Sequence, residues 1–549
     1  MSREQILLTL LVFAGLTPRG LAAQTQDPPI TLVTREVELA SLDPGADIGS
    51  LVVSSDGRRV AFRAESGKKW FVVATGQQGK TYDAIRTSGF KPSDTPPMYA
   101  VAREQLPDLA DKQEQKDPVA IAFSPDGARL AYVAQRGKTY LAVVDGLEGT
   151  AYDGVSAPVF SPDGKRVAYR ARRDKTQFVV VDGIEHKAFD EIVEATLTFS
   201  PDGQRLAYGA RRGKDFFIVE NDTEGHPYDA IGAPRFSPDG QHLAYGARRG
   251  DQQFIVRDGH EGTAYQGLSA PFFSPDGQRM AYIARRGAQS LVVVDGQEGT
   301  AYDGVGAPVF SPDGKRVAHG GRRGQKWRVV VDGQEGKEYD SMQNPLFSPD
   351  GQRVAYVANG DKLMVVVDGQ EGPACDGIMK GTPVFSSDSK RIAYCALRGG
   401  KSIVLVDGQE GTAYDDVGAG PRFFSADGKR VAYSAQRGEK EFAVVDGQEG
   451  KAYDHIVVGT PIFSPDGKHV AYGARSDERW VIVVDGQESR VRGFVDGALP
   501  SFDGSNRLHV VVGRGPIVTP PELLKGLPPE QRKQMKAISG GIARMEITW

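Results

Sequence analysis

Cysteine is almost absent from this chain, which carries two among its 549 residues. Any disulfide must therefore join Cys375 to Cys395, and a scaffold held together by several bridges is excluded. Both cysteines stand at positions that read as strands, so two small buried thiols are the favoured interpretation and a single bridge is the alternative.

A basic excess is also missing, because 67 Lys and Arg stand against 71 Asp and Glu and give a formal net charge of -4. Nucleic acid is therefore not an expected partner. The apolar run Ile6–Leu16 follows Arg3 and precedes a small-residue stretch, and it is too short to span a bilayer. We interpret residues 1–23 as a cleaved signal peptide and, with no cysteine beside it for lipid attachment, expect a periplasmic or secreted bacterial protein.

Sequence signatures of catalysis are lacking as well. The chain has no Gly-x-Ser-x-Gly motif and no phosphate-binding glycine loop, and its eight histidines show no metal-ligand spacing. The Asp-Gly-Gln-Glu-Gly loops offer only two carboxylates each, which is too few for a calcium loop. His319 replaces the tyrosine of its repeat and is interpreted as a core substitution. We expect no catalytic residue, no cofactor and no metal.

Glycine is abundant, at 67 residues, and much of it lies in a repeated Ser-Pro-Asp-Gly turn. Asp126 and Asp503 are 377 residues apart and are separated by ten repeat steps, so one repeat is 37–39 residues long. An earlier copy at Ser55–Gly57 implies an insertion, residues 86–117, and brings the count to about twelve repeats. The aspartates of the turn and its variants are Asp126, Asp163, Asp202, Asp239, Asp276, Asp313, Asp350, Asp388, Asp427, Asp466 and Asp503.

Each repeat predicts four short antiparallel strands. In one unit Pro-Asp-Gly joins a strand at Pro158–Ser161 to one at Arg166–Tyr169, since Pro sets φ and Gly accepts a positive φ. A basic turn leads to the apolar run Phe178–Val181, and Asp-Gly opens the fourth strand, which ends at Phe189. Runs without polar alternation suit a strand covered on both faces.

A single four-stranded sheet cannot bury both of its faces, so neighbouring repeats must cover one another. The sequence therefore predicts an all-β fold, a β-propeller of about twelve four-stranded repeats. Two six-bladed rings or one large ring would both satisfy the count, and two rings are favoured because most propellers have four to eight blades.

The repeated string resembles the WD-like propeller repeat of the TolB family, whose hallmark is Phe/Trp-Ser-Pro-Asp-Gly-x-x-Ile/Val-Ala-Tyr/Phe. It stands here as Phe160–Tyr169, Phe199–Tyr208, Phe236–Tyr245 and Phe310–Ala318. The resemblance covers residues 48–512 and implies a propeller only, without the α/β domain that precedes it in TolB. The resemblance does not indicate a particular function, because the family includes both interaction proteins and propellers attached to peptidases.

The two ends of the chain offer closing strands. The segment 24–47 contains a predicted strand at Thr31–Leu39, and the tail 513–549 contains another at Ala543–Trp549. We expect both to complete the last blade and to bring the termini together, whereas the alternative is an unstructured tail.

Two loop chemistries are predicted to lie on opposite sides of the ring. Acidic Asp-Gly turns share one side, and arginine pairs share the other with the Tyr-Asp links between blades. The arginines could bind an acidic peptide or an anionic glycan, but pairing with the link aspartates is the favoured role. The candidate partner-binding residues are Arg172, Arg173, Arg211, Arg212, Arg248, Arg249, Arg285, Arg286, Arg322 and Arg323, with Tyr99 of the insertion.

The sequence as a whole predicts an exported, non-enzymatic propeller that serves as a protein-interaction or envelope-binding scaffold. Its partner would be a protein or an anionic envelope polymer. Two alternatives remain: a glycan lyase or hydrolase with carboxylates in a propeller channel, and a purely structural envelope protein. The insertion breaks the repeat and is either functional or disordered.

Overall fold

The computed structural model describes residues 33–42, 46–55, 58–86, 121–418, 423–477, 479–491, 500–504, 506–514 and 540–548. The expected signal peptide and nearly all of the expected insertion, including Tyr99, lie outside these residues. Within the described ranges, no helix is long and apolar enough to cross a membrane.

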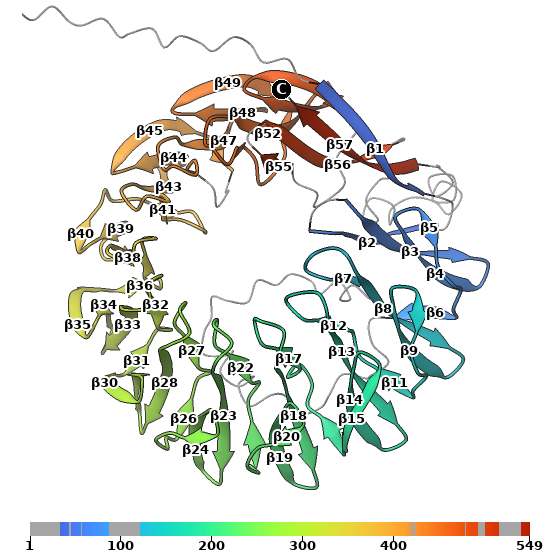
Figure 1. The fold of residues 1–549 in the computed structure, drawn as a ribbon. Coiled ribbons are helices and arrows are strands. Elements are labelled where there is room, and N and C mark those ends of the chain that lie inside the picture. The colour runs from blue at the N-terminus through green and yellow to red at the C-terminus, as the bar shows by residue number, and fades with distance from the viewer. Residues whose placement is uncertain are drawn as a thin grey trace, which may run out of the picture.

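The described residues form twelve antiparallel sheets that follow one another around a single ring (Figure 1). The chain is thus an all-β propeller with repeated blades, as its sequence predicts. The favoured division into two six-bladed rings is wrong, because the outer part of every blade from the first to the eleventh leads on to the next blade of the same ring. We number the blades 1 to 12 in chain order, beginning with the sheet that contains Ala46.

Each blade has four strand positions, and the strand nearest the central opening is usually split into two short pieces. The innermost strands are β2 (Ala46–Val53); β6 (Ala84–Arg86) and β7 (Ile121–Phe123); β11 (Gly154–Val155) and β12 (Val159–Phe160); β16 (Glu191–Ile192) and β17 (Thr198–Phe199); β21 (Ala230–Ile231) and β22 (Arg235–Phe236); β26 (Gly267–Leu268) and β27 (Phe272–Phe273); β31 (Gly304–Val305) and β32 (Val309–Phe310); β36 (Ser341–Met342) and β37 (Leu346–Phe347); β41 (Gly377–Ile378) and β42 (Val384–Phe385); β46 (Asp416–Val417); β50 (His455–Ile456) and β51 (Ile462–Phe463); and β55 (Ser501–Gly504).

The second and third strands of each blade form its centre. The second strands are β3 (Val60–Ser66), β8 (Leu130–Arg136), β13 (Val167–Arg173), β18 (Leu206–Arg212), β23 (Leu243–Arg249), β28 (Met280–Arg286), β33 (Val317–Arg323), β38 (Val354–Asn359), β43 (Ile392–Arg398), β47 (Ala432–Arg437), β52 (Val470–Ser476) and β56 (Arg507–Arg514). The third strands are β4 (Lys69–Ala74), β9 (Thr139–Val144), β14 (Thr176–Val181), β19 (Asp215–Glu220), β24 (Gln252–Arg257), β29 (Gln289–Val294), β34 (Lys326–Val331), β39 (Leu363–Val367), β44 (Lys401–Val406), β48 (Lys440–Val445), β53 (Arg479–Val484) and β57 (Gly540–Thr548).

The outer strands complete the blades. They are β5 (Gln77–Gln78), β10 (Leu147–Glu148), β15 (Ile184–Phe189), β20 (Thr223–Glu224), β25 (His260–Glu261), β30 (Gln297–Tyr302), β35 (Gln334–Tyr339), β40 (Gln370–Glu371), β45 (Gln409–Tyr414), β49 (Gln448–Tyr453), β54 (Gln487–Val491) and β1 (Val33–Leu42).

The hydrophobic core lies between blades rather than within one. Val180 packs with Val133 and Tyr152 of the preceding blade, whereas its neighbours Val179 and Val181 pack with Leu206 of the following blade. Successive side chains of a strand point to opposite faces, so both faces of the third strand are buried. This two-sided burial explains why the Val runs show no polar alternation.

Blade 12 is assembled from both ends of the chain. Its strand order is β1-β57-β56-β55, with β1 antiparallel to β57 over Val33–Leu42. Figure 1 shows the first and last strands side by side. Blade 12 also packs on blade 11, since Leu508, Val510 and Ile547 share a cluster with Ile482 and Val484.

Candidate binding surface

The two sides of the ring carry different turns. The side with the first and third hairpin turns is called the turn face, and there Arg166 Nε lies 3.5 Å from Asp182 Oδ2 while the Val167 N–H donates to Asp182 Oδ1 at 2.9 Å. The other side, with the second turns and the inter-blade links, is called the link face. On this face the second turn of a blade is hydrogen-bonded to the link that precedes the blade: the Asp174 N–H donates to Asp153 Oδ2 at 2.7 Å.

The Ser-Pro-Asp-Gly turn is held by hydrogen bonds inside the motif. Ser161 Oγ donates to Asp163 Oδ1 at 2.6 Å and accepts the Arg166 N–H at 2.9 Å. Gly164 has φ 72°, which disfavours other residues. The serine hydroxyl lowers the pKa of the aspartate, to about 2 for Asp427. The same direction holds for Asp126, Asp163, Asp202, Asp239, Asp276, Asp313, Asp350 and Asp388.

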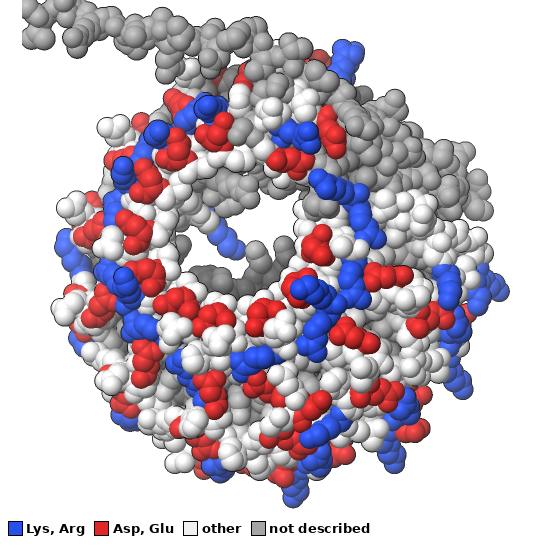
Figure 2. Space-filling view, viewed as in Figure 1, with Lys and Arg blue, Asp and Glu red and all other residues white. Residues whose placement is uncertain are grey.

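Neighbouring turns touch one another on the turn face. A Cβ on Gly314 would lie 2.7 Å from Asp276 Oδ1 of the preceding blade, and one on Gly164 would lie 2.9 Å from Asp126 Oδ1. The glycine is therefore needed for its small size as well as its φ. Figure 2 shows acidic and basic side chains interspersed over the face in view, with acidic ones along part of the edge of the central opening.

An arginine clamps most joints between blades. Arg316 of blade 7 donates from Nη1 to the carbonyl oxygens of Gly351 and Gln352 in blade 8, at 3.1 and 2.7 Å. Its Nε pairs with Asp332 of its own blade at 2.9 Å, and its guanidinium lies over the Phe347 ring at 5.3 Å. Equivalent clamps are made by Arg59, Arg129, Arg166, Arg205, Arg279, Arg353, Arg391 and Arg430.

The joint between blades 5 and 6 departs from this pattern at three positions. His242 stands in place of the clamp arginine and places Nδ1 2.7 Å from Asp258 Oδ2. Arg257 occupies a position that holds Val in most repeats, and its Nη2 reaches across the joint to the Gln278 carbonyl at 3.2 Å. His260 stands at a third-turn position that is Gln in most repeats and that also varies in blades 2 to 4, as Leu147, Ile184 and Thr223.

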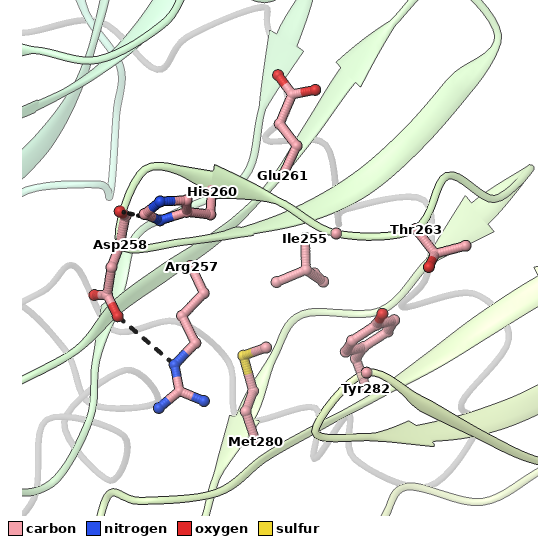
Figure 3. A pocket seen from close by; sticks show the side chains of 10 residues that line it. Ile255, Arg257, Asp258, His260, Glu261, Thr263, Met280 and Tyr282 are labelled. Atoms are coloured by element: carbon pink, nitrogen blue, oxygen red, sulfur yellow. Dashed lines mark hydrogen bonds and ion pairs between the residues drawn. The ribbon is translucent and has the colours of Figure 1, made fainter.

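A hollow of about 500 Å³ opens at this joint. It is lined by blade 5 residues Ile255, Arg257, Asp258, His260, Glu261, Gly262 and Thr263 and by blade 6 residues Met280, Tyr282 and Gly296. Figure 3 shows Ile255, Met280 and Tyr282 between the polar residues, whereas Glu261 points away from them. The sequence carries a signal for this hollow, because Arg257 stands where most sister repeats have Val.

The second arginine of each candidate pair is not among the residues that line this hollow, and it binds a glutamate of its own blade. The ion pairs are Arg173–Glu185 at 2.6 Å, Arg212–Glu224 at 3.0 Å, Arg249–Glu261 at 2.7 Å, Arg286–Glu298 at 2.5 Å and Arg323–Glu335 at 2.8 Å. In most blades the tyrosine that ends the preceding outer strand donates to the same glutamate, as Tyr152 does to Glu185 at 2.9 Å. The tyrosine thereby joins adjacent blades at the glutamate that the arginine holds.

The favoured Arg–Asp pairing is therefore wrong for these side chains. The link aspartates accept backbone N–H groups of the second turn, as Asp229 does from Gly250 at 2.7 Å. The guanidinium of the second arginine instead pairs with the glutamate of its own blade, as Arg249 does with Glu261. The first arginines of the pairs have different partners from blade to blade. Arg211 pairs with Glu191 at 2.9 Å, and Arg248 donates to the Gly250 carbonyl at 3.2 Å. Arg172 and Arg322 donate to the carbonyls of Asp153 and Asp303, both at 3.2 Å, and Arg285 lies opposite Gly267 in its sheet.

Other predicted positions are placed in the core. Cys375 and Cys395 are both buried and free, in line with the favoured thiol interpretation, and burial raises the pKa of Cys395 to about 11. His319 is buried, its ring packs edge-on against Tyr302, and burial lowers its pKa. In the part of the chain that the structure describes, no three His, Cys, Asp or Glu residues gather in a way that could hold a metal ion.

No family model and no curated protein matches the chain. Solved propellers resemble it distantly. TolB from Acinetobacter baumannii has 17% identity and a TM-score of 0.22, over 55% of this chain and 78% of that one. The propeller domain of the Trilobed protease from Pyrococcus furiosus has 14% identity and a TM-score of 0.24, over 47% and 96%. The Dos1 propeller has 12% identity and a TM-score of 0.27, over 52% and 91%. Identities this low concern the fold alone.

Proposed function

We propose that this chain is an exported, non-enzymatic propeller that binds a protein or an envelope polymer through its turn face. The observation that carries the proposal is the hollow between blades 5 and 6. A packing requirement recurs in every blade, whereas a binding site is needed once, and at this joint His242 replaces the clamp arginine and Arg257 replaces Val around an open space. Export to the periplasm or beyond, and kinship with the TolB-like repeat family, belong to the same proposal and rest on the sequence.

The arrangement of carboxylates gives less support to the enzymatic alternative. A glycosidase needs one carboxyl group whose pKa is raised so that it can act as a general acid. The turn aspartates have lowered pKa values, because serine hydroxyls and backbone N–H groups bind the ionised form. These carboxylates act as acceptors within their turns. The purely structural alternative leaves the irregular joint between blades 5 and 6 without a role.

Blocking one face of the ring at a time tests the proposal. Gln297→Cys places a thiol on the turn face of blade 6, and Ala288→Cys places one on the link face of the same blade; both positions are exposed. A maleimide-linked polyethylene glycol would react with either new thiol, because the two natural cysteines are buried and have raised pKa values.

Each labelled protein is then used to capture partners from bacterial envelope extract. We expect the label at residue 297 to reduce capture strongly and the label at residue 288 to leave it unchanged. Equal capture by the two labelled proteins would contradict binding through the turn face.

A further inference from the structure

Arg257 brings a guanidinium into the joint between blades 5 and 6 at a position where a regular blade is apolar. The equivalent residues of the flanking blades are Glu220 and Val294. The Arg257 side chain is 27% exposed, its Nη2 donates to the neutral Gln278 carbonyl, and its Nε is 3.7 Å from Asp258 Oδ2. A guanidinium has five N–H donors, and these contacts occupy only part of the fork.

The two carboxylates that line the hollow, Glu261 and Asp258, already have partners that are not among its lining residues. Glu261 binds Arg249 Nη2 at 2.7 Å and accepts the Tyr228 hydroxyl at 3.1 Å. Asp258 accepts the Leu243 N–H at 2.8 Å through Oδ1 and lies 2.7 Å from His242 Nδ1 through Oδ2. A cationic ligand would find these acids engaged and would lie beside Arg257. An anionic ligand would meet Arg257 directly.

The walls between these groups are apolar. Ile255, Met280 and Tyr282 are all buried and face the hollow from two blades (Figure 3). A volume of about 500 Å³ is in the range of small-ligand sites. A ligand with one charged end and a short aliphatic stem matches a single guanidinium beside Ile255 and Met280.

We propose that this hollow binds a carboxylate on a short aliphatic stem, presented as an exposed glutamate side chain of a partner protein and held by Arg257. The inference rests on the proposed function, because it names the chemistry recognised at the same face. Guanidinium and carboxylate form parallel N–H···O bonds, so the pair is directional as well as charged. One guanidinium, partly balanced by Asp258, suits a singly charged carboxylate better than a doubly charged phosphate.

Binding of three probes to the full chain tests the inference. The probes are the capped tripeptides acetyl-Ala-Glu-Ala-amide and acetyl-Ala-Gln-Ala-amide, and free valerate, each followed by saturation-transfer difference NMR at low salt. We expect the Glu tripeptide to bind at least about tenfold more tightly than the Gln tripeptide, which corresponds to the loss of one charged hydrogen-bonded pair.

Arg257→Val supplies the decisive variant, since Val is the residue that most sister repeats carry and the fold should keep its thermal midpoint. Glu220→Val, at the equivalent position one blade earlier, is the control: it removes the ion pair of Arg205 in that joint and changes no residue that lines the hollow. We expect Arg257→Val to lose binding of the Glu tripeptide about tenfold and Glu220→Val to retain it. Equal binding by wild type and Arg257→Val, or equal binding of the Glu and Gln tripeptides, would overturn the inference.

The valerate arm separates the two sources of a carboxylate. Binding of valerate without the Glu tripeptide would overturn the assignment to a partner's side chain, whereas binding of both supports it. Failure here is distinguishable from failure of the proposed function: blocked capture by the turn-face label together with unchanged tripeptide binding in Arg257→Val would leave the function standing and remove this ligand. Tripeptide binding that depends on Arg257, together with capture that the turn-face label does not block, would keep this ligand and contradict binding of the partner through the turn face.

Discussion

At the scale of single residues, the repeat is built from polar side chains that each serve a specific backbone group. Ser311 is fully buried, donates to Asp313 Oδ1 at 2.6 Å and accepts the Arg316 N–H at 2.9 Å. A buried hydroxyl without partners would cost free energy, so this serine is tied to the turn. The motif predicted the turn itself, because Pro, Asp and Gly have known turn preferences.

The partners of the arginine pairs could not be read in the same way. Strand order places an arginine and a link aspartate on the same side, which makes their pairing the natural expectation. An arginine side chain is long enough to lie along the strand, however, and Arg249 reaches Glu261 on the outer strand while stacking over Tyr228 at 5.4 Å. The choice between the two acids depends on side-chain conformation, which spacing in the sequence does not specify.

His319 leads to a prediction about pH. Burial lowers its pKa, because the charged imidazolium is poorly solvated there. The unfolded chain, with a pKa of about 6.5, then binds the proton more readily than the folded protein. Stability is therefore full above about pH 6.5 and decreases as the pH falls below it. We expect His319→Tyr, which restores the residue of sister repeats, to raise the thermal midpoint more at pH 5 than at pH 8.

Circular dichroism melts at the two pH values check this expectation. His226→Gln serves as a control, because His226 is exposed. That variant should leave the difference between pH 5 and pH 8 as it is in the wild type. A gain from His319→Tyr that is the same at both pH values would show that His319 is not held neutral by the fold.

At the scale of blades, the clamp arginine decides how firmly two neighbours are joined. Among the residues that the structure describes, nine joints carry an arginine clamp, and two clamp positions carry histidine, at His242 and His469. These histidines belong to blades 5 and 11, which are six blades apart in a ring of twelve. Histidine is shorter than arginine, and each of these two lies against the aspartate of its own blade, at 2.7 Å for Asp258 and 2.5 Å for Asp485.

Exchanging these residues should change joint stability in opposite directions. His242→Arg introduces the clamp between blades 5 and 6, and Arg316→His removes it between blades 7 and 8. After allowance for solvent exposure we expect about 1 kcal/mol in each case, a gain for the first and a loss for the second. Amide hydrogen exchange of peptides from the two blades at each joint measures the effect.

Faster exchange at the joint between blades 5 and 6 in His242→Arg would contradict the role given to the clamp. Peptides from blades 2 and 3, whose Arg129 is untouched, provide the internal reference in the same experiment. Their exchange should be identical in all three proteins.

The sequence predicted most of the blade and missed where blades differ. Four strands per repeat, the turn chemistry and burial of the Val runs all follow from local patterns that recur many times. The split of the innermost strand, as between β11 and β12, arises because both pieces pair with the single longer strand β13. The hollow does not follow from the consensus repeat, because its lining includes Arg257 where most repeats have Val, and the sequence does not specify which departures from the consensus leave an open space.

At the scale of the whole molecule, the number of blades in the ring depends on the small rotation between one blade and the next. With twelve blades in one ring, each blade is rotated from the last by about a twelfth of a turn, and a rotation twice as large at each joint would have closed a ring of six. That rotation is set by side chains packed between blades, among them Tyr208, Ala210 and Val179. A repeat sequence gives the number of blades but not this angle, and for that reason the preference for two rings was wrong.

Closure of the ring depends on the first strand, which leads to our last prediction. The outer strand β1 pairs with β57 from Val33 to Leu42, and after three intervening residues β2, the innermost strand of blade 1, begins at Ala46. The same segment therefore completes blade 12 and connects it covalently to blade 1. Without it, β57 becomes an edge strand with unpaired N–H and C=O groups, and blade 12 loses this covalent connection to blade 1.

We expect a chain that starts at residue 43 to have a lower thermal midpoint and, by small-angle X-ray scattering, a larger radius of gyration than a chain that starts at residue 24, which retains β1. A synthetic peptide of residues 33–42 should restore part of the midpoint by pairing with β57, but it should not restore the compact ring, because it lacks the connection to β2. If the shortened chain keeps the radius of gyration of the longer one, contacts between blades alone hold the ring closed.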